Sequence, residues 1–130
     1  MRLEVVGRRA FYQPTGSVSV EQVTQLVASA IAECRARDVG ELVANICGLT
    51  GYVLGMSDRM FAVQTWAEAA AGRVILALVM PAEAIHPSKF GVLVARRASM
   101  VAAVFTTEPD AVAWLDGQPK TQDRGPRTPD

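Results

Sequence analysis

Residues 41–59 read ELVANICGLTGYVLGMSDR, and we expect the rest of the chain to be arranged around this segment. Residues 42–46 form an almost unbroken apolar run, which is typical of a strand buried on both faces of a sheet. Glycines at positions 48, 51 and 55 then predict a loop that needs backbone freedom. Ser57, with Asp58 behind it, is the expected cap of a helix. A buried parallel strand, a loop and a helix start in this order commonly form a docking edge in open α/β sheets.

The composition predicts one domain and excludes several classes of function. The chain has 130 residues, and 50% of them are hydrophobic, which is enough for a core but leaves no room for a second domain. Thirteen basic and thirteen acidic side chains balance, so we expect no nucleic-acid partner. The longest apolar run, residues 74–81, is far below the roughly 20 residues of a membrane span. The N-terminus alternates and lacks a secretory pattern, so we expect a cytoplasmic protein without membrane insertion.

Cysteine and histidine are too few for a recognisable metal site. Cys34 and Cys47 could pair, but a chain with a good core does not require a disulfide, and we expect two reduced cysteines that are buried as small apolar residues. With His86 as the single histidine and no short ligand spacing, we expect no metal and no cofactor.

The N-terminal third predicts a hairpin and a helix. Alternating apolar residues at 3–7 and 10–13 indicate two antiparallel strands joined at Gly7. Ser19 followed by Gln22 is a capping box, and apolar residues at helical spacing continue to Cys34, which predicts a helix with Cys34 on its buried face.

After the central loop, helices and strands alternate. A helix from Ser57 to residue 71 should end at Gly72 and bury a stripe of Met60, Val63, Ala67 and Ala70 beside Trp66. The further elements are a strand at 74–79, a helix at 88–97, a strand at 101–105 and a helix from Thr107 to Gly117.

This order predicts an α/β fold, a mostly parallel sheet with helices packed on it. Ile46, Leu76, Val104 and Trp114 are expected to organise its core. The domain should span residues 1–116. Residues 117–130 contain no apolar side chain and are expected to form a flexible C-terminal tail.

Taken together, these motifs resemble a known family. The chain resembles the STAS domain, which is shared by sulfate transporter tails and bacterial anti-sigma factor antagonists. It is most similar to the antagonist-like branch of small stand-alone bacterial proteins. The resemblance covers residues 3–115 and implies a single STAS-like domain with a regulatory role. The residues that carry it are LVANICGLTG at 42–51, Trp66 with Ala67, HPSKFG at 86–91 and VAAVFTTEPDAVAWL at 101–115.

The resemblance also implies a regulatory position. In the antagonists, a partner kinase phosphorylates a serine or threonine at the start of the second helix, within an Asp-Ser-Ser-Gly type motif. This chain lacks that motif, and the nearest matching positions are Thr50 and Ser57, on a longer Gly-rich loop.

Chemistry-bearing side chains should gather where the parallel strands end. Together with cationic side chains, the helix N-termini there would suit an anion such as phosphate. Alternatively, Ser57, Ser88 and Thr107 only cap their own helices. The binding or regulatory candidates are Thr50, Gly51, Tyr52, Ser57, Arg59, His86 and Lys89, with Thr106 and Thr107 on the last loop.

No catalytic motif is present in the sequence. His86 could act as a general base if Ser57 or Cys47 were in reach, although a solvated loop histidine is the simpler interpretation. Cys47 has apolar neighbours and no adjacent cation, so its thiol should be unreactive. We therefore expect a non-enzymatic STAS-like module that binds a protein partner or small ligand through the loop after residue 47, as a monomer or homodimer. The alternative is an anion-binding or lipid-binding protein, or a hydrolase, that uses the same sheet edge.

Overall fold

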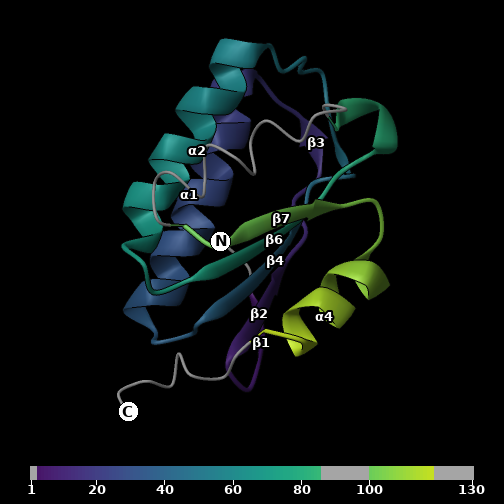
Figure 1. Cartoon of the computed structure of the whole chain (residues 1–130). Helices are drawn as coiled ribbons and strands as arrows, with labels where there is room; N and C mark the ends of the chain where they lie inside the picture. The colour runs from purple at the N-terminus through teal and green to yellow at the C-terminus, as the bar shows by residue number, and fades with distance from the viewer. Residues whose placement is uncertain (1–2, 86–99, 119–130) are drawn as a thin grey trace.

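A five-stranded sheet forms the centre of the molecule, with strand order β1-β2-β4-β6-β7 (Figure 1). The computed structural model describes residues 3–85 and 100–118. The strands of this sheet are β1 (Glu4–Val6), β2 (Arg9–Tyr12), β4 (Glu41–Asn45), β6 (Ile75–Val79) and β7 (Ala102–Phe105). The helices are α1 (Val20–Ala36), α2 (Met56–Ala70) and α4 (Glu108–Asp116), with a short 3-10 turn η1 (Ala82–Ala84).

The sheet is parallel except at its first strand. β1 pairs antiparallel with β2 through a turn at Gly7, whose φ is 64°. The pairs β2 with β4, β4 with β6, and β6 with β7 are all parallel. The predicted hairpin, the central position of the 42–46 strand and the mostly parallel α/β sheet are therefore confirmed.

Helices cover both faces of the sheet. Figure 1 shows α1 and α2 side by side on one face and α4 on the other. Along β4, Leu42 and Ala44 belong to the cluster under α1 and α2, whereas Val43 belongs to the cluster under α4. A strand with two covered faces needs apolar residues at every position, which is why residues 42–46 do not alternate with polar ones.

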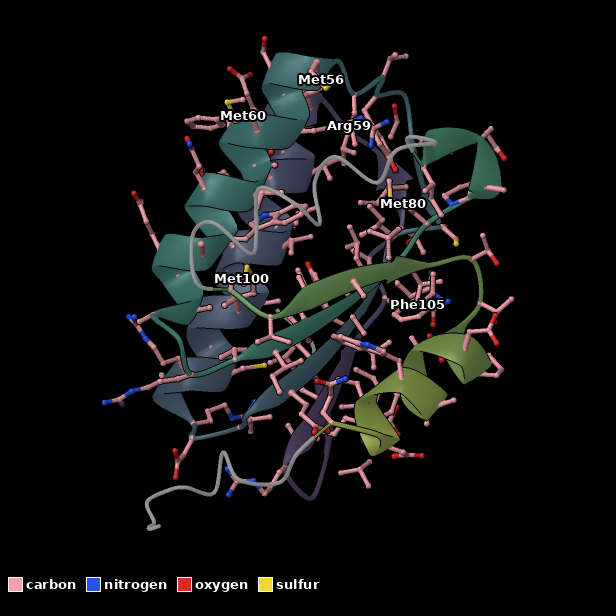
Figure 2. The ribbon with its side chains drawn as sticks, viewed as in Figure 1. Met56, Arg59, Met60, Met80, Met100 and Phe105 are labelled. Atoms are coloured by element: carbon pink, nitrogen blue, oxygen red, sulfur yellow. The ribbon has the colours of Figure 1, made fainter. Side chains whose placement is uncertain are left out.

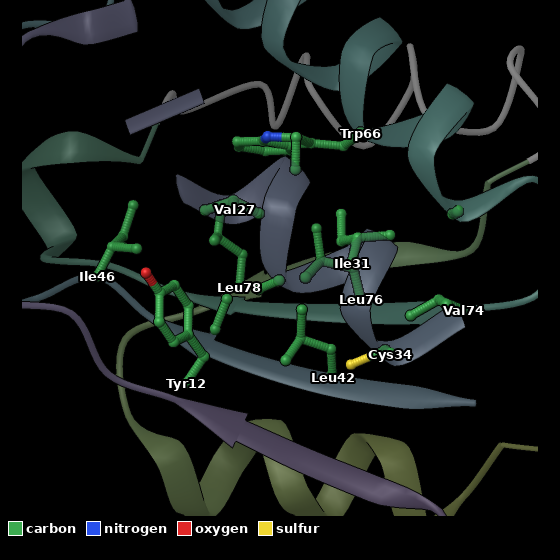
Figure 3. Packing of buried hydrophobic residues seen from close by; sticks show 14 of the residues in the cluster. Tyr12, Val27, Ile31, Cys34, Leu42, Ile46, Trp66, Val74, Leu76 and Leu78 are labelled. Atoms are coloured by element: carbon green, nitrogen blue, oxygen red, sulfur yellow. The ribbon is translucent and has the colours of Figure 1, made fainter. Parts of the chain in front are cut away.

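The face under α1 and α2 holds the main core. Ile31, Leu42, Leu76 and Trp66 are all buried there, between the helices and the sheet (Figure 3). The Trp66 indole Nε1 donates a buried hydrogen bond of 2.9 Å to the backbone oxygen of Thr24, which ties α2 to α1. α1 begins with the predicted capping box.

The capping box at the start of α1 consists of two hydrogen bonds. Gln22 N donates to Ser19 Oγ at 3.1 Å, and Ser19 N donates to Gln22 Oε1 at 2.8 Å. Cys34 is buried near the end of α1, as predicted.

The prediction of one core organised by four residues is wrong in part. Ile46 and Leu76 are buried under α1 and α2, and Val104 is partly buried against the same cluster. Trp114, however, lies on the opposite face and is only partly buried. Its ring centroid is 5.6 Å from that of Phe105, and the buried residues of α4 are Ala111 and Leu115 instead.

The loop after Cys47 contains a strand that the sequence did not predict. β5 (Leu49–Thr50) pairs in parallel with β3 (Gly16–Ser17) as a small second sheet. Gly51 directly follows β5 and has a φ of 88°, and a Cβ at that position would lie 2.7 Å from Ser17 Oγ. The Gly-rich loop is therefore held against the chain just before α1.

The start and the buried face of α2 also differ from the prediction. Gly55 is the N-cap residue and its N–H donates to Asp58 Oδ2 at 2.9 Å, so Ser57 is an exposed residue inside the first turn and caps nothing. Val63 and Ala70 are buried with Trp66, but Met60 is exposed. The helix ends before Gly72, with Ala71 in a left-handed conformation of φ 49°.

Near the C-terminus, the predicted helix start at Thr107 is confirmed. Asp110 N donates to Thr107 Oγ1 at 3.3 Å, and Gly117 caps the other end. The predicted helix at 88–97 and most of the tail at 117–130 lie outside the described residues. Within residues 3–85 and 100–118, no helix is both long enough and apolar enough to cross a membrane.

Candidate functional site

The candidate site lies at the carboxyl edge of the sheet, where β4, β6 and β7 end. Three segments meet there: the loop from Cys47 to Gly55, the turn η1 and the start of α4. Because parallel strands bring their carboxyl ends to one edge, side chains distant in sequence gather at this place.

Thr50 and Gly51 belong to the part of the loop held by β3. Thr50 is exposed on β5, and its Oγ1 donates a long hydrogen bond of 3.5 Å to the Gly16 carbonyl. Val18 N donates to the Thr50 carbonyl at 2.8 Å, which extends the small sheet. These contacts position the loop but bring no second functional side chain to Thr50.

Arg59 connects α2 to η1. Its Nη2 donates to the Ala84 carbonyl at 2.7 Å, and the side chain is partly buried. Burial raises the pKa of the Tyr52 phenol, Cys47 raises this pKa further and Arg59 lowers it. Tyr52 therefore lies near enough to Cys47 and Arg59 for their charges to act on the phenol. The structure therefore brings together Tyr52, Arg59 and Cys47, with the Arg59 guanidinium already bonded to a backbone oxygen.

The prediction that Cys47 is buried is wrong, because this residue follows the end of β4 and its side chain is exposed. Its surroundings nevertheless disfavour the thiolate. Its N–H donates to Asn45 Oδ1 at 3.0 Å, while Asn45 Nδ2 donates to Glu108 Oε2 at 3.0 Å. Partial burial raises the pKa of the thiol, and the carboxylates of Glu108 and Glu83 raise it further. A thiol in this setting stays protonated at neutral pH, which agrees with the predicted lack of reactivity.

Asn45 and Glu108 were not among the predicted site residues. They join the end of β4 to the first turn of α4, across 63 residues of sequence. The signal in the sequence is weak: a single polar residue, Asn45, interrupts the apolar run two residues before Cys47. An asparagine in that position commonly bonds the backbone two residues further on, but its second partner depends on the tertiary fold.

The described charges at this edge are mostly negative. Asp58, Glu83, Glu108 and Asp110 lie on the loops and helix starts, against the single described cation Arg59. This balance does not favour the expected anion. His86, Ser88 and Lys89 lie outside the described residues, so the anion site stays a prediction. Within the described ranges, no three His, Cys, Asp or Glu side chains are placed to hold a metal ion.

Of the three expected caps, the structure describes two. Thr107 caps α4 through its hydroxyl, which is the simpler of the two roles considered for it. Ser57 does not cap α2, and its hydroxyl is exposed at the second helical position. Thr50 precedes Tyr52 in the sequence and Ser57 follows it, and both hydroxyl-bearing residues are exposed. Among the described residues, no side-chain hydrogen bond connects Thr50 with Ser57.

The most distinctive feature beside the loop is an exposed group of large apolar side chains, which we call the apolar patch. Val53 is 86% exposed, Met56 49%, Met60 40% and Phe61 60%. Figure 2 shows Met56 and Met60 along the upper half of α2, with Arg59 on the side that faces η1. The sequence does not predict this patch, because the helical spacing of Met60 is that of a core residue.

Comparison with known proteins adds a resemblance in fold. No family model matches the chain, and no curated protein matches it significantly. Among solved structures, the chain is similar to the unphosphorylated form of the anti-sigma factor antagonist SpoIIAA. The TM-score is 0.49 and the sequence identity 20%, over 90% of this chain and 98% of that chain.

Proposed function

We propose that the chain is a cytoplasmic, non-enzymatic regulatory or binding module that binds a protein partner. The binding segment is residues 47–61, which comprises the loop after β4 and the first turns of α2. Its determinants are Thr50, Ser57 and Arg59 together with the apolar patch.

The apolar patch is the observation that supports this proposal. Large apolar side chains on a folded domain lose favourable burial free energy when they face water, and contiguous exposed patches commonly mark interaction sites. Val53 and Phe61 are more than half exposed, and both are in or next to the segment that the sequence singled out.

Ser57 is the position where a negative charge would act on this surface. It is exposed, one residue after Met56 and one before Asp58, in the first turn of α2. A negative group at a helix N-terminus is tolerated by the backbone dipole, so a charge there should change binding without unfolding the domain.

A comparison of recovered partners tests the proposal. The full chain and its variants Val53→Asp and Ser57→Asp are used as immobilised baits, and retained proteins are identified by mass analysis of the purified complexes. Val6→Asp is the matched control, because Val6 is also strongly exposed but lies at the hairpin on the first strand. We expect a partner that binds the wild type and Val6→Asp, and that is lost or at least tenfold weaker with both loop variants.

Two results would contradict the proposal. Partners that bind all four proteins equally would place the binding surface elsewhere. Calorimetric binding of inorganic phosphate to the full chain, abolished by Arg59→Ala, would instead support the anion-binding alternative.

A further inference from the structure

The apolar patch also contains information about the kind of partner, and this inference rests on the proposed function. We propose that the patch binds an amphipathic helix of another protein, with an apolar face and a basic end.

The size of the patch excludes a stable dimer through this surface alone. Four side chains with these exposed fractions leave roughly 400 Å² of apolar surface, the scale of the largest patch on an ordinary monomer. A stable protein complex buries about 800 Å² on each partner. A short helix with three or four apolar anchors is of matching size, and binding of an amphipathic helix by an apolar surface is a common mode of recognition.

The composition of the patch suits an irregular apolar partner. Met56 and Met60 are unbranched and adaptable, and Phe61 supplies a rigid aromatic surface beside them. Methionine-rich surfaces of this type adjust to helices of different sequence, and aromatic side chains are enriched in the core of protein interfaces.

Charge on α2 determines the expected polarity of the partner. The helix has one basic residue, Arg59, which is bonded to Ala84 on the side facing η1. Glu68 is exposed and follows Met60 by eight residues, with exposed Gln64 halfway, so the three side chains form one row. The positive end of the helix dipole lies at Met56 and disfavours cations there. The basic end of the partner should therefore contact Glu68, and its apolar face should contact Phe61 and Met56.

The same charges argue against a lipid surface. Peripheral attachment of an apolar patch to anionic lipids requires clustered Lys or Arg beside it. Among the described residues on and next to the patch, the cation is Arg59 alone, and it is accompanied by Asp58, Glu68 and Glu83.

A pair of model peptides tests the inference on the full chain. Both peptides are 18-residue helices with the same leucine face, one with lysines and one with glutamates at the C-terminal end, and binding is followed by fluorescence anisotropy. We expect the lysine peptide to bind at least tenfold more tightly than the glutamate peptide. Phe61→Ser should weaken the lysine peptide at least tenfold, whereas Val6→Ser, the exposed control on β1, should not change it.

Changing the charge at Glu68 tests the expected polarity of the partner most directly. Glu68→Gln should weaken the lysine peptide about threefold and reduce its salt dependence, and Glu68→Lys should reverse the preference between the two peptides. Circular dichroism of each variant checks that the domain remains folded, which we expect because Phe61 and Glu68 are exposed.

Several outcomes would overturn the inference. These are equal binding of both peptides, insensitivity to Phe61→Ser, binding of anionic vesicles that Phe61→Ser abolishes, or dimerisation in sedimentation that Phe61→Ser abolishes. If the peptides fail but Val53→Asp still releases a cellular partner, only this inference is wrong. If the peptides behave as expected but cellular partners bind Val53→Asp and Ser57→Asp as tightly as the wild type, the proposed function is wrong instead.

Discussion

The two faces of the central sheet are built differently. The face under α1 and α2 has a thick cluster that includes Trp66, Ile31 and Leu42, and a buried hydrogen bond joins its two helices. The face under α4 has a small cluster around Val43, Val79 and Leu115, with Phe105 and Trp114 partly buried at its margin. We infer that stability comes mainly from the first face, and that the second is closed by a thinner layer with polar contacts at both ends of α4.

Those polar contacts are specific. Asn45 bonds Glu108 at the start of α4, and Arg9 bonds Asp116 at its end. Arg9 also bonds Glu41 at 2.8 Å, so one guanidinium joins β2, β4 and α4. Helix α4 is therefore positioned by polar bonds as well as by burial.

The largest contrast is expected between the two tryptophans. Trp66→Ala should cost about 3–5 kcal/mol, because it leaves a large cavity between α1 and α2 and removes the bond to Thr24. Trp114→Ala should cost only about 1–2 kcal/mol, because its ring is already partly in water. Denaturant unfolding of both variants gives the comparison, and equal losses would show that the faces contribute equally.

Two neighbouring residues on β6 allow the two faces to be compared with side chains of the same size. Leu76 is buried under α1 and α2, whereas Ile75 lies under α4. We expect Leu76→Ala to cost about 3–4 kcal/mol and Ile75→Ala about 2 kcal/mol, since the thinner layer relaxes more easily around a cavity. A larger loss for Ile75→Ala in the same unfolding measurement would reverse the assignment of the main core.

Cys34 reports how well the first face excludes water. Burial raises the pKa of its thiol to about 11 from a usual value of 9.0. The thiol ionises more readily in the unfolded chain, so its contribution is complete below about pH 9 and is lost as the pH rises toward 11. One unit of pKa corresponds to about 1.4 kcal/mol, so the free energy of unfolding should fall by roughly 2–3 kcal/mol over this range.

The Cys34→Ala variant isolates this effect. Burial also raises the pKa of Tyr12 and of Tyr52, and both contribute to the alkaline loss of stability in either protein. The informative quantity is therefore the difference in pH slope between the wild type and Cys34→Ala. Parallel slopes from pH 8 to pH 11 would mean that water reaches Cys34 in the folded protein.

The smallest effect concerns the ion pairs at the end of α4. Arg9→Met should lower the free energy of unfolding by about 1–2 kcal/mol, because nearly buried Glu41 loses its partner. Arg37→Met is the control, since Arg37 and Glu33 form an exposed pair at 3.8 Å that should contribute less than about 0.5 kcal/mol. Thermal unfolding at low and high salt distinguishes the two pairs, and equal, small shifts would show that polar bonds do not position α4.

Much of the fold was predictable from the sequence because its signals are local. The apolar runs at 42–46 and 75–79 require strands that are covered on both faces, and the structure places both in the middle of the sheet. Ser19 with Gln22, and Thr107 on its own, predicted helix starts because a cap bonds a backbone group only three residues away.

The same local reasoning failed at α2. A serine, an aspartate and an apolar stripe were all present, but Asp58 caps the helix by bonding Gly55 N, and Ser57 is left exposed. Met60 has the spacing of a core residue, but whether a helical residue is buried depends on which elements pack on that side of the helix.

By itself, then, the sequence determined the α/β class, the order along the chain of the five main-sheet strands and of α1, α2 and α4, and the approximate position of the loop, since each depends on patterns a few residues long. The strand order, the pairing of β3 with β5 and the bond from Arg59 to Ala84 depended on the tertiary structure. So did the bond from Asn45 to Glu108 and the exposure of the apolar patch. The two side-chain bonds join residues that are 25 and 63 positions apart in sequence. The exposure of the apolar patch depends on which other elements pack beside α2. Both are determined by how the whole chain packs and not by local sequence patterns.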